Sequence, residues 1–400
     1  MSIVKNTIIV IGGGYAGLQA IEELAKEPVN EIKLFDKNPY HYMQTDVYDL
    51  IANEGDFADV TVDLNSFCAG FCSVVEFIKE EVINIDFITK KVIIKNNEYS
   101  YDSLILAVGA RTKFCSNIMG LKEHGYGIKA LHRAMYFKQK FEMSLFKKLD
   151  QGGRYCEPLT IVIAGAGLSG VEIAAQMASF ASDFYKNNNF ICRKLNIVLV
   201  NSGSEILKGV DKKLVKQSQN HLDKLGVITL CNQKVVKITE DKVTLSDGEI
   251  IMMDYMIFAG GIEPNGLIHK LNIAKNEFGY VEIDEYLKSS QYDDVYAVGD
   301  CTTIYVNDKA LPPTADVAEQ MGILAAQNIN AKTLNKKQSK HNIKSRGILI
   351  ALGRGYAVAF LYGFYIKGYP AYLLKKTVEK VYAWKLDKRS KRGCAKIFND

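Results

Sequence analysis

A glycine-rich turn that joins an apolar strand to a helix occurs twice in this chain. The first turn follows the run from Thr7 to Ile11, and the second follows the run from Leu159 to Ala164. Strands that are apolar along their whole length belong to parallel sheets with helices on both faces. The two turns therefore predict an α/β fold with two nucleotide sites.

The first turn has the glycine spacing of a Rossmann-like dinucleotide site. Gly12, Gly14 and Gly17 fit the pattern G-x-G-x-x-G, and Tyr15 and Ala16 lie inside it. The first glycine permits the tight turn, the second lets backbone approach a pyrophosphate, and the third allows close packing of helix on strand. The pyrophosphate would rest on the positive N-terminus of the helix.

An acid at the end of the next strand supports a dinucleotide at this turn. The run from Ile32 to Phe35 is that strand, and Asp36 closes it. A carboxylate in this place can accept hydrogen bonds from ribose hydroxyls. A later strand ends near Ala107 and Gly109, and we expect both residues to lie against the same nucleotide.

The second turn repeats this geometry with Gly165, Gly167 and Gly170. Glu172 falls just inside the helix, where an acid either serves the nicotinamide or only compensates the helix dipole. The next strand ends at Asn201, where an NADH site usually has a carboxylate. Asn still bonds a ribose, more weakly than a carboxylate does, and no arginine follows to hold a 2′-phosphate. NADH is therefore favoured over NADPH.

Composition is that of an ordinary soluble protein. A length of 400 residues predicts two or three domains, and the net charge of +5 is modest. The eight cysteines are scattered, with no CxxC pair and no zinc spacing, so we expect reduced thiols and no metal site. A strand begins within the first residues, which leaves no room for a signal peptide and predicts a cytoplasmic protein.

The C-terminal part has a different pattern. Residues 332–345 are polar and basic, as in a surface linker, and residues 347–366 are then almost entirely apolar. Gly353, Arg354 and Gly355 interrupt that run. An arginine in the middle of a bilayer costs at least ~2.5 kcal/mol, so a β-hairpin is favoured over a spanning helix.

The tail beyond this run is basic and amphipathic. Nine lysines and arginines stand against two acids over residues 367–392, a net +7, which leaves 5 − 7 = −2 for the rest of the chain. Apolar side chains recur on one helical face, at Leu374, Val378, Val381 and Tyr382. This pattern predicts an interfacial helix on an anionic membrane. A basic helix docked on its own domain is the alternative, and no nucleic-acid-binding module is recognisable.

Taken together, these motifs resemble the type II (alternative, non-proton-pumping) NADH:quinone oxidoreductases, which are glutathione-reductase-like flavoproteins. The stretch from Val295 to Asp300 is similar to the second FAD motif, and the resemblance implies that Asp300 binds the ribityl chain. Pro313–Gln320 is similar to the quinone-site motif AQxAxQ, with Asp316 in place of a glutamine. Gly347–Arg354 is similar to the GxLxxLG stretch that precedes the membrane-binding tail.

The resemblance implies a reaction in two halves, with hydride passing from NADH to FAD and two electrons then passing to a membrane quinone. FAD is expected to be non-covalent, because no histidine or cysteine stands in the first glycine turn. Gly260, after the strand from Tyr255 to Ala259, is a further candidate for cofactor binding. The candidate catalytic residues are Glu172 and Gln320, and the candidate quinone-site residues are Ala315, Asp316, Ala318 and Gln320.

The expected organisation has three parts. Residues 1–115 and 285–345 form a discontinuous FAD-binding domain, residues 116–284 form the NAD(P)H-binding domain, and residues 346–400 form the hairpin and the basic membrane-binding tail. By resemblance, the enzyme is peripheral on the cytoplasmic face of the cell membrane and a possible homodimer.

Two alternatives stay open. A sulfide:quinone oxidoreductase shares this fold but uses a distant cysteine pair, and after Cys301 only Cys394 remains. The second alternative is an FAD- and NAD-binding redox regulatory protein. A disulfide reductase is disfavoured, because the stretch from Tyr40 to Leu50 contains no cysteine.

Overall fold

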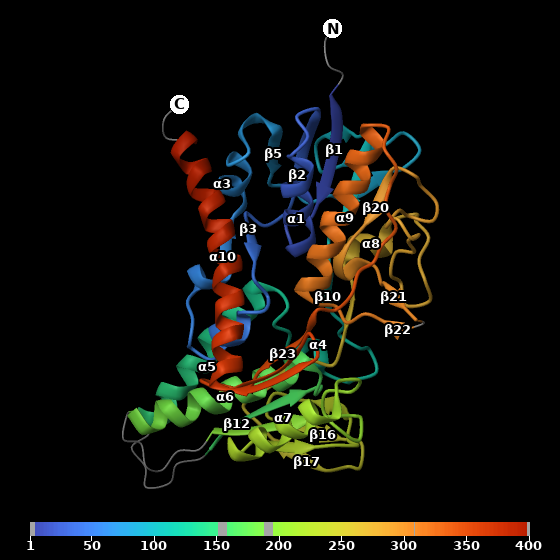
Figure 1. Ribbon diagram of the computed structural model, residues 1–400. Helices are drawn as coiled ribbons and strands as arrows, with labels where there is room; N and C mark the ends of the chain where they lie inside the picture. The colour runs from blue at the N-terminus through green and yellow to red at the C-terminus, as the bar shows by residue number, and fades with distance from the viewer. Residues whose placement is uncertain (1–4, 151–157, 188–194, 308, 398–400) are drawn as a thin grey trace.

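Two five-stranded parallel sheets organise the chain (Figure 1). The computed structural model describes residues 5–150, 158–187, 195–307 and 309–397. The first sheet has the strand order β20-β9-β1-β2-β5, and its strands are β1 (Asn6–Ile11), β2 (Asn30–Phe35), β5 (Val75–Ile78), β9 (Ser103–Leu106) and β20 (Val295–Ala297). Because β20 comes late in the sequence, two separate segments build this sheet.

The second sheet is formed by the part of the chain between β9 and β20. Its order is β11-β18-β12-β13-β14, and its strands are β11 (Gly125–Tyr126), β12 (Leu159–Ala164), β13 (Leu195–Val200), β14 (Ile228–Leu230) and β18 (Tyr255–Phe258). The central strands of both sheets are buried on both faces, as their apolar runs predict. The predicted α/β fold with two Rossmann-like units is confirmed.

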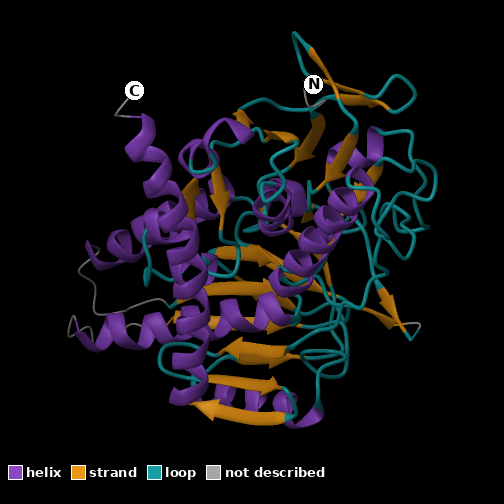
Figure 2. Cartoon of the chain, turned by 45° about the horizontal axis from the view of Figure 1, so that its top comes forward, coloured by secondary structure: helices purple, strands orange, loops and turns teal. Residues whose placement is uncertain are grey.

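Long helices cover these sheets, and Figure 2 shows strands in the middle of the molecule with helices beside them. Leu18, Ile21 and Leu24 recur on one face of the first helix and are fully buried in the core of the first sheet. The helices are α1 (Tyr15–Leu24), α5 (Leu131–Asp150), α6 (Leu168–Asn187), α7 (Lys212–Lys224) and α9 (Ala315–Thr333).

Smaller elements complete both units. Strands β6 and β7 form an antiparallel pair within residues 82–94, and β8 joins them in one sheet. The smaller elements are β3 (Tyr40–Tyr42), α2 (Val47–Ile51), β4 (Thr61–Asp63), α3 (Leu64–Ala69), β6 (Asn84–Asp86), β7 (Lys91–Ile93), β8 (Glu98–Ser100), β10 (Ala110–Thr112), α4 (Leu121–His124), β15 (Val235–Ile238), β16 (Lys242–Leu245), β17 (Ile250–Met252), β19 (Ile262–Pro264), α8 (Gly266–Lys270), β21 (Tyr305–Val306) and β22 (Lys309–Ala310), with 3₁₀ turns η1 (Phe57–Val60), η2 (Cys72–Val74) and η3 (Gly299–Cys301).

The C-terminal apolar run is the antiparallel hairpin that its central glycines predict. Strands β23 (Gly347–Ala351) and β24 (Ala357–Leu361) pair along their whole length. A third strand, β25 (Phe364–Gly368), pairs with β24 and was not predicted. No helix in the described part of the chain is long and apolar enough to cross a membrane.

The last helix, α10 (Tyr369–Ile397), runs beside α3 and lies along the first unit (red in Figure 1). Leu386 is buried in the core there, together with Phe67 of α3. The opposite face of α10 is exposed and carries Val381 and Trp384, which are 45% and 56% exposed. The helix is therefore docked on its own protein and still presents apolar side chains to the surroundings. Two members of the expected apolar face, Val378 and Tyr382, line a cavity, although Val378 is also 59% exposed.

Candidate functional site

A cavity of about 490 Å³ lies where the carboxyl ends of the two sheets come together. Both glycine turns contribute to its wall, through Gly14 after β1 and Leu168 after β12. The segments after β9 and β20 contribute Gly109 and Asp300. In parallel α/β sheets this edge is where nucleotides bind, since the helix N-termini and the backbone of the turns gather there.

The first glycine turn has the shape that a pyrophosphate needs. A Cβ on Gly12, whose φ is +107°, would lie 2.3 Å from the carbonyl oxygen of Ala107. A Cβ on Gly17 would lie 2.0 Å from the carbonyl oxygen of Gly12. A Cβ on Gly14 would meet nothing within 4 Å, so this position faces open space. The predicted roles of the three glycines fit these surroundings, with room for phosphate beside Gly14.

Asp36 lies at the end of β2 and supports the same turn. Its Oδ2 accepts a hydrogen bond from the backbone N–H of Gly13 at 2.8 Å, and its Oδ1 accepts one from the N–H of Asn38 at 2.8 Å. Burial raises the pKa of this carboxyl, while the two N–H donors oppose the rise. Each oxygen keeps a further lone pair that a ribose hydroxyl could use.

Asp300 lies in the 3₁₀ turn η3 at the cavity wall and is paired with a lysine. Lys129 Nζ lies 2.7 Å from Asp300 Oδ2, and both side chains are about one-fifth exposed. Lys129 stands in a loop without a recognisable motif, so the sequence alone gave no sign of it. Residues fit for FAD therefore lie in or next to this part of the cavity. The open glycine turn and Asp300, which could bind polar groups of the chain between flavin and phosphates, line it. Asp36, which could bind a ribose, is not among the described lining residues but is bonded to the turn at Gly13.

The second glycine turn has the same construction. A Cβ on Gly165 would lie 2.5 Å from the carbonyl oxygen of Ala259, and one on Gly170 would lie 1.8 Å from the carbonyl oxygen of Gly165. Gly167, like Gly14, faces open space. The predicted cofactor residue Gly260 is not among the described residues that line the cavity, whereas its two neighbours, Ala259 and Gly261, do line it.

Asn201 lies at the end of β13 and braces its own loop. Its Nδ2 donates to the carbonyl oxygens of Gly203 at 3.1 Å and of Glu205 at 2.7 Å. A carboxylate could make neither bond, since it has no donor. The departure from the usual acid at this position therefore has a local structural reason.

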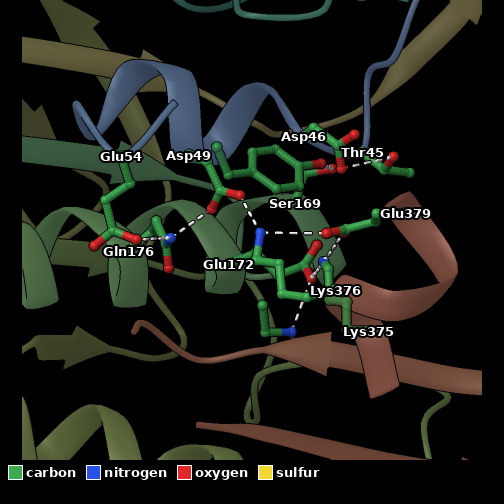
Figure 3. Close-up of polar contacts among 12 residues, drawn as sticks. Thr45, Asp46, Asp49, Glu54, Ser169, Glu172, Gln176, Lys375, Lys376 and Glu379 are labelled. Carbon is green, nitrogen blue, oxygen red and sulfur yellow. Dashed lines mark hydrogen bonds and ion pairs between the residues drawn. The ribbon is translucent and has the colours of Figure 1, made fainter. Parts of the chain in front are cut away.

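Glu172 is buried at the cavity wall and is held by two donors (Figure 3). Its Oε1 accepts from the N–H of Ala351 at 2.9 Å and from Lys375 Nζ at 2.6 Å. Burial raises the pKa of Glu172, and the Lys375 ammonium opposes this rise. The three residues come from α6, β23 and α10, so the carboxylate joins the second unit to the C-terminal segment.

The predicted quinone-site residues divide into two groups. Ala315, Asp316 and Ala318 line the cavity at the start of α9. Gln320 is not among the described residues that line the cavity. Its Nε2 donates to Asp316 Oδ2 at 3.1 Å and to the carbonyl oxygen of Lys344 at 3.0 Å. The neighbouring Glu319 does line the cavity, and burial, with Asp316 nearby, raises its pKa to about 7.

A histidine links α10 to the first glycine turn. His41 is fully buried; its Nδ1 lies 2.8 Å from the carbonyl oxygen of Gly13, and its Nε2 lies 3.2 Å from the Tyr382 hydroxyl. A carbonyl only accepts, so Nδ1 carries the proton and Nε2 accepts from Tyr382. Burial lowers the pKa of His41 to about 4, and the ring is neutral at pH 7.

Sequence reasoning missed the inward face of α10. Lys375, Glu379 and Tyr382 all line the cavity, and Leu386 continues the same face into the core. These residues recur at i, i+4, i+7 and i+11, which is a helical stripe that the sequence does contain. The excess of positive charge in the tail indicated a membrane-facing surface and gave no sign of this inward face.

Comparisons with known proteins agree with this architecture. The sequence profile of the pyridine nucleotide-disulphide oxidoreductase family matches residues 6–322. The type II NADH:quinone oxidoreductase of Staphylococcus aureus is 26% identical, over 94% of each chain, and that of Staphylococcus saprophyticus is 25% identical, over 96% of each.

Solved structures share the fold. NDH2 from Plasmodium falciparum, in complex with NADH, superposes with a TM-score of 0.85 at 19% identity and covers 97% of each chain. The sulfide:quinone oxidoreductase of Aquifex aeolicus superposes with a TM-score of 0.81 at 20% identity, over 96% of this chain and 92% of that one. Since the family profile spans both glycine turns and most of the sequence, the chain belongs to the pyridine nucleotide-disulphide oxidoreductase family.

Proposed function

We propose that this chain is an FAD-dependent NADH:quinone oxidoreductase that works without proton pumping. One observation carries the proposal: a single cavity is lined by both glycine turns and by the start of α9, Ala315–Ala318. A nicotinamide donor, a flavin and an acceptor can therefore meet in one place. Full-length similarity to enzymes named type II NADH:quinone oxidoreductases supports the same assignment.

Different groups of the chain would bind FAD, NADH and quinone. FAD, when bound, supplies the two-electron redox chemistry. Gly14, Asp36 and Asp300 would hold it, and NADH would bind at the turn around Gly167 with Glu172 nearby. The quinone would lie against Ala315–Ala318, beside β23. We place the FAD-binding domain at residues 1–115 and 285–345 and the NAD(P)H-binding domain at residues 116–284.

The lining of the cavity favours a quinone over a disulfide or sulfide acceptor. No cysteine is among the described residues that form its wall. Cys301 lies behind the wall, fully buried, with its thiol directed at the carbonyl oxygens of Leu106 and Val298. Burial raises the pKa of this thiol to about 12, so the nucleophilic thiolate is scarce.

The outer face of the C-terminal segment supports peripheral attachment to a membrane, and attachment on the cytoplasmic side is a further proposal. Exposed apolar side chains there are accompanied by lysines, a pattern typical of surfaces that enter the headgroup region of anionic bilayers. The exposed apolar residues are Tyr362, Phe364, Tyr369, Leu373, Val378, Val381 and Trp384. Homodimer formation is a further proposal that rests on the family resemblance.

Two anaerobic half-reactions test the function. NADH should bleach the flavin absorbance of the purified protein faster than NADPH, and sulfide should leave it unchanged. A quinone added afterwards should restore the absorbance within the time of one turnover. Reduction by NADH without reoxidation by any quinone would instead favour a redox regulatory protein, and rapid bleaching by sulfide would favour the sulfide:quinone alternative.

A further inference from the structure

Two carboxyl groups stand between the cavity and a second, outer cavity. The outer cavity, of about 750 Å³, lies between α10 and the segment from Met43 to Ser66, and its rim includes the exposed residues Asp59, Asp63 and Lys380. Among the described residues, only Asp46 and Glu379 line both cavities. These two carboxyl groups are therefore placed to pass a proton from the outer cavity to the inner one.

The two carboxyl groups lie close enough to share a proton. Asp46, just before α2, lies within hydrogen-bonding reach of the Glu379 carboxyl of α10. A hydrogen bond between two carboxyl groups requires a proton on one of them. Burial, and then the charge of Glu379, raise the pKa of Asp46 to about 8. A proton shared in this way leaves a single negative charge on the pair.

Two lysine ammonium groups compensate the negative charge of the pair. Lys375 Nζ and Lys376 Nζ lie 3.4 Å and 3.2 Å from the Glu379 carboxylate (Figure 3). Lys376 also pairs with Asp49. Glu172 of α6 faces Glu379 across Lys375, and the charge of Glu379 is one of the causes that raise the pKa of Glu172. The tyrosines Tyr15, Tyr42 and Tyr382 face Asp46, and burial raises the pKa of each above the ordinary range. These phenols stay protonated and can donate or relay.

Hydrogen bonds continue from the pair toward the first glycine turn. Thr45 Oγ1 lies 3.3 Å from Asp46 Oδ1, and the Tyr15 hydroxyl lies 3.0 Å from Thr45 Oγ1. Tyr15 belongs to the glycine motif itself. All four side chains, Tyr15, Thr45, Asp46 and Glu379, line the inner cavity.

The proposed reaction needs a supply of protons to the inner cavity. Its balance is NADH + H⁺ + quinone → NAD⁺ + quinol. The hydride brings two electrons and one proton, whereas the quinone takes up two electrons and two protons. One proton per turnover must therefore enter from the solvent to a cavity with mostly apolar walls.

We propose that Asp46 and Glu379 form the proton entry of this enzyme, taking a proton from the outer cavity and delivering it to the acceptor side of the inner one. The inference rests on the proposed quinone reductase function. After each delivery the pair is left with two negative charges beside Lys375 and Lys376, and uptake of one proton from the outer cavity restores it.

The test compares Asp46→Asn with Asp387→Asn. The Asp46 carboxyl caps no backbone N–H at the start of α2, so an isosteric amide preserves the local structure. Asp387 lines only the outer cavity and pairs with Lys391 at the surface, so Asp387→Asn is the matched control. Each FAD-loaded protein is reduced with NADH and mixed with quinone across pH 6–10, and reduction and reoxidation of the flavin are followed separately.

In the wild type, reoxidation should slow progressively above about pH 8, where the pair loses its proton. Asp46→Asn should slow reoxidation by ~10²-fold, the lower range for loss of a general acid, and should remove that pH dependence. Reduction by NADH should stay within about twofold, since hydride transfer needs no proton from this pair. Asp387→Asn should behave as the wild type, and Asp46→Glu should restore part of the rate.

Infrared spectroscopy provides a readout that needs no turnover. The carbonyl band of a protonated carboxyl should disappear as the wild-type protein is titrated through pH 8, and Asp46→Asn should lack this band. The same band in both proteins, or a loss of reoxidation in Glu319→Gln instead, would overturn the proposal. A wild type that no quinone reoxidises would refute the proposed function alone, because the infrared titration would still report the pair.

Discussion

At the scale of single residues, His41 makes stability depend on pH. Its ring is neutral in the fold, with a pKa lowered to about 4 by burial, whereas an unfolded histidine titrates near 6.5. The unfolded chain therefore binds more protons between these values. Stability that is present above pH 6.5 is lost as the pH falls toward 4, by about 2 kcal/mol at pH 5.

This dependence can be measured by urea unfolding at pH 7 and pH 5. His41→Gln keeps a donor and an acceptor but cannot take up a proton, so the difference between the two pH values should shrink by about 2 kcal/mol in the variant. His132→Gln is the control, because the His132 side chain is exposed. Equal losses in the wild type and in His41→Gln would place the sensitive group elsewhere.

At the scale of elements, α10 has two faces with different partners. Its inward face carries Lys375, Glu379 and Tyr382 to the cavity, so removing the helix would open the site as well as remove the membrane contact. Substitutions on the outer face separate the two roles. Serine at Leu373, Val381 and Trp384 should weaken binding to anionic vesicles at any salt concentration.

Glutamine at Lys380, Lys385 and Lys388 should weaken vesicle binding by about 3 kcal/mol at low salt, ~1 kcal/mol for each lysine, and have less effect at high salt. Both sets should keep FAD and reduce water-soluble quinones. The double change Ile250→Ser with Met252→Ser is a control, since these exposed side chains lie on β17, far from α10 in the chain. Vesicle flotation that is unaffected by either set would remove α10 from the membrane contact.

The sequence revealed the elements whose pattern is local. Both glycine turns, their strands and the hairpin at Gly353 depend on contacts within a few residues, and each was predicted. The packing of α10 on α3 could not be predicted, because the stripe that includes Glu379 looks the same whether solvent or protein covers it. The lysine that pairs with Asp300 was equally invisible, since that contact joins loops 171 residues apart.

At the scale of the whole molecule, Glu172 and Lys375 hold the second unit against the C-terminal segment. Glu172→Gln would remove a negative charge that compensates the buried Lys375 ammonium, so the free energy of unfolding should fall by about 3 kcal/mol. Flavin reduction should also slow. The double variant with Lys375→Met should recover most of that stability, since no buried charge then lacks its partner. Urea unfolding of both single variants and the double variant measures the coupling, and simple additivity would contradict it.

The contact between Tyr382 and His41 joins positions 341 residues apart. During synthesis the glycine turn and its histidine leave the ribosome long before the helix that covers them is translated. A chain paused before α10 can form both parallel sheets, since domains fold as units from the N-terminal side, but its nucleotide pocket lacks one wall. Nascent protein should therefore exchange flavin freely and retain it only after release, which gives the cell a period in which cofactor supply limits how much enzyme matures.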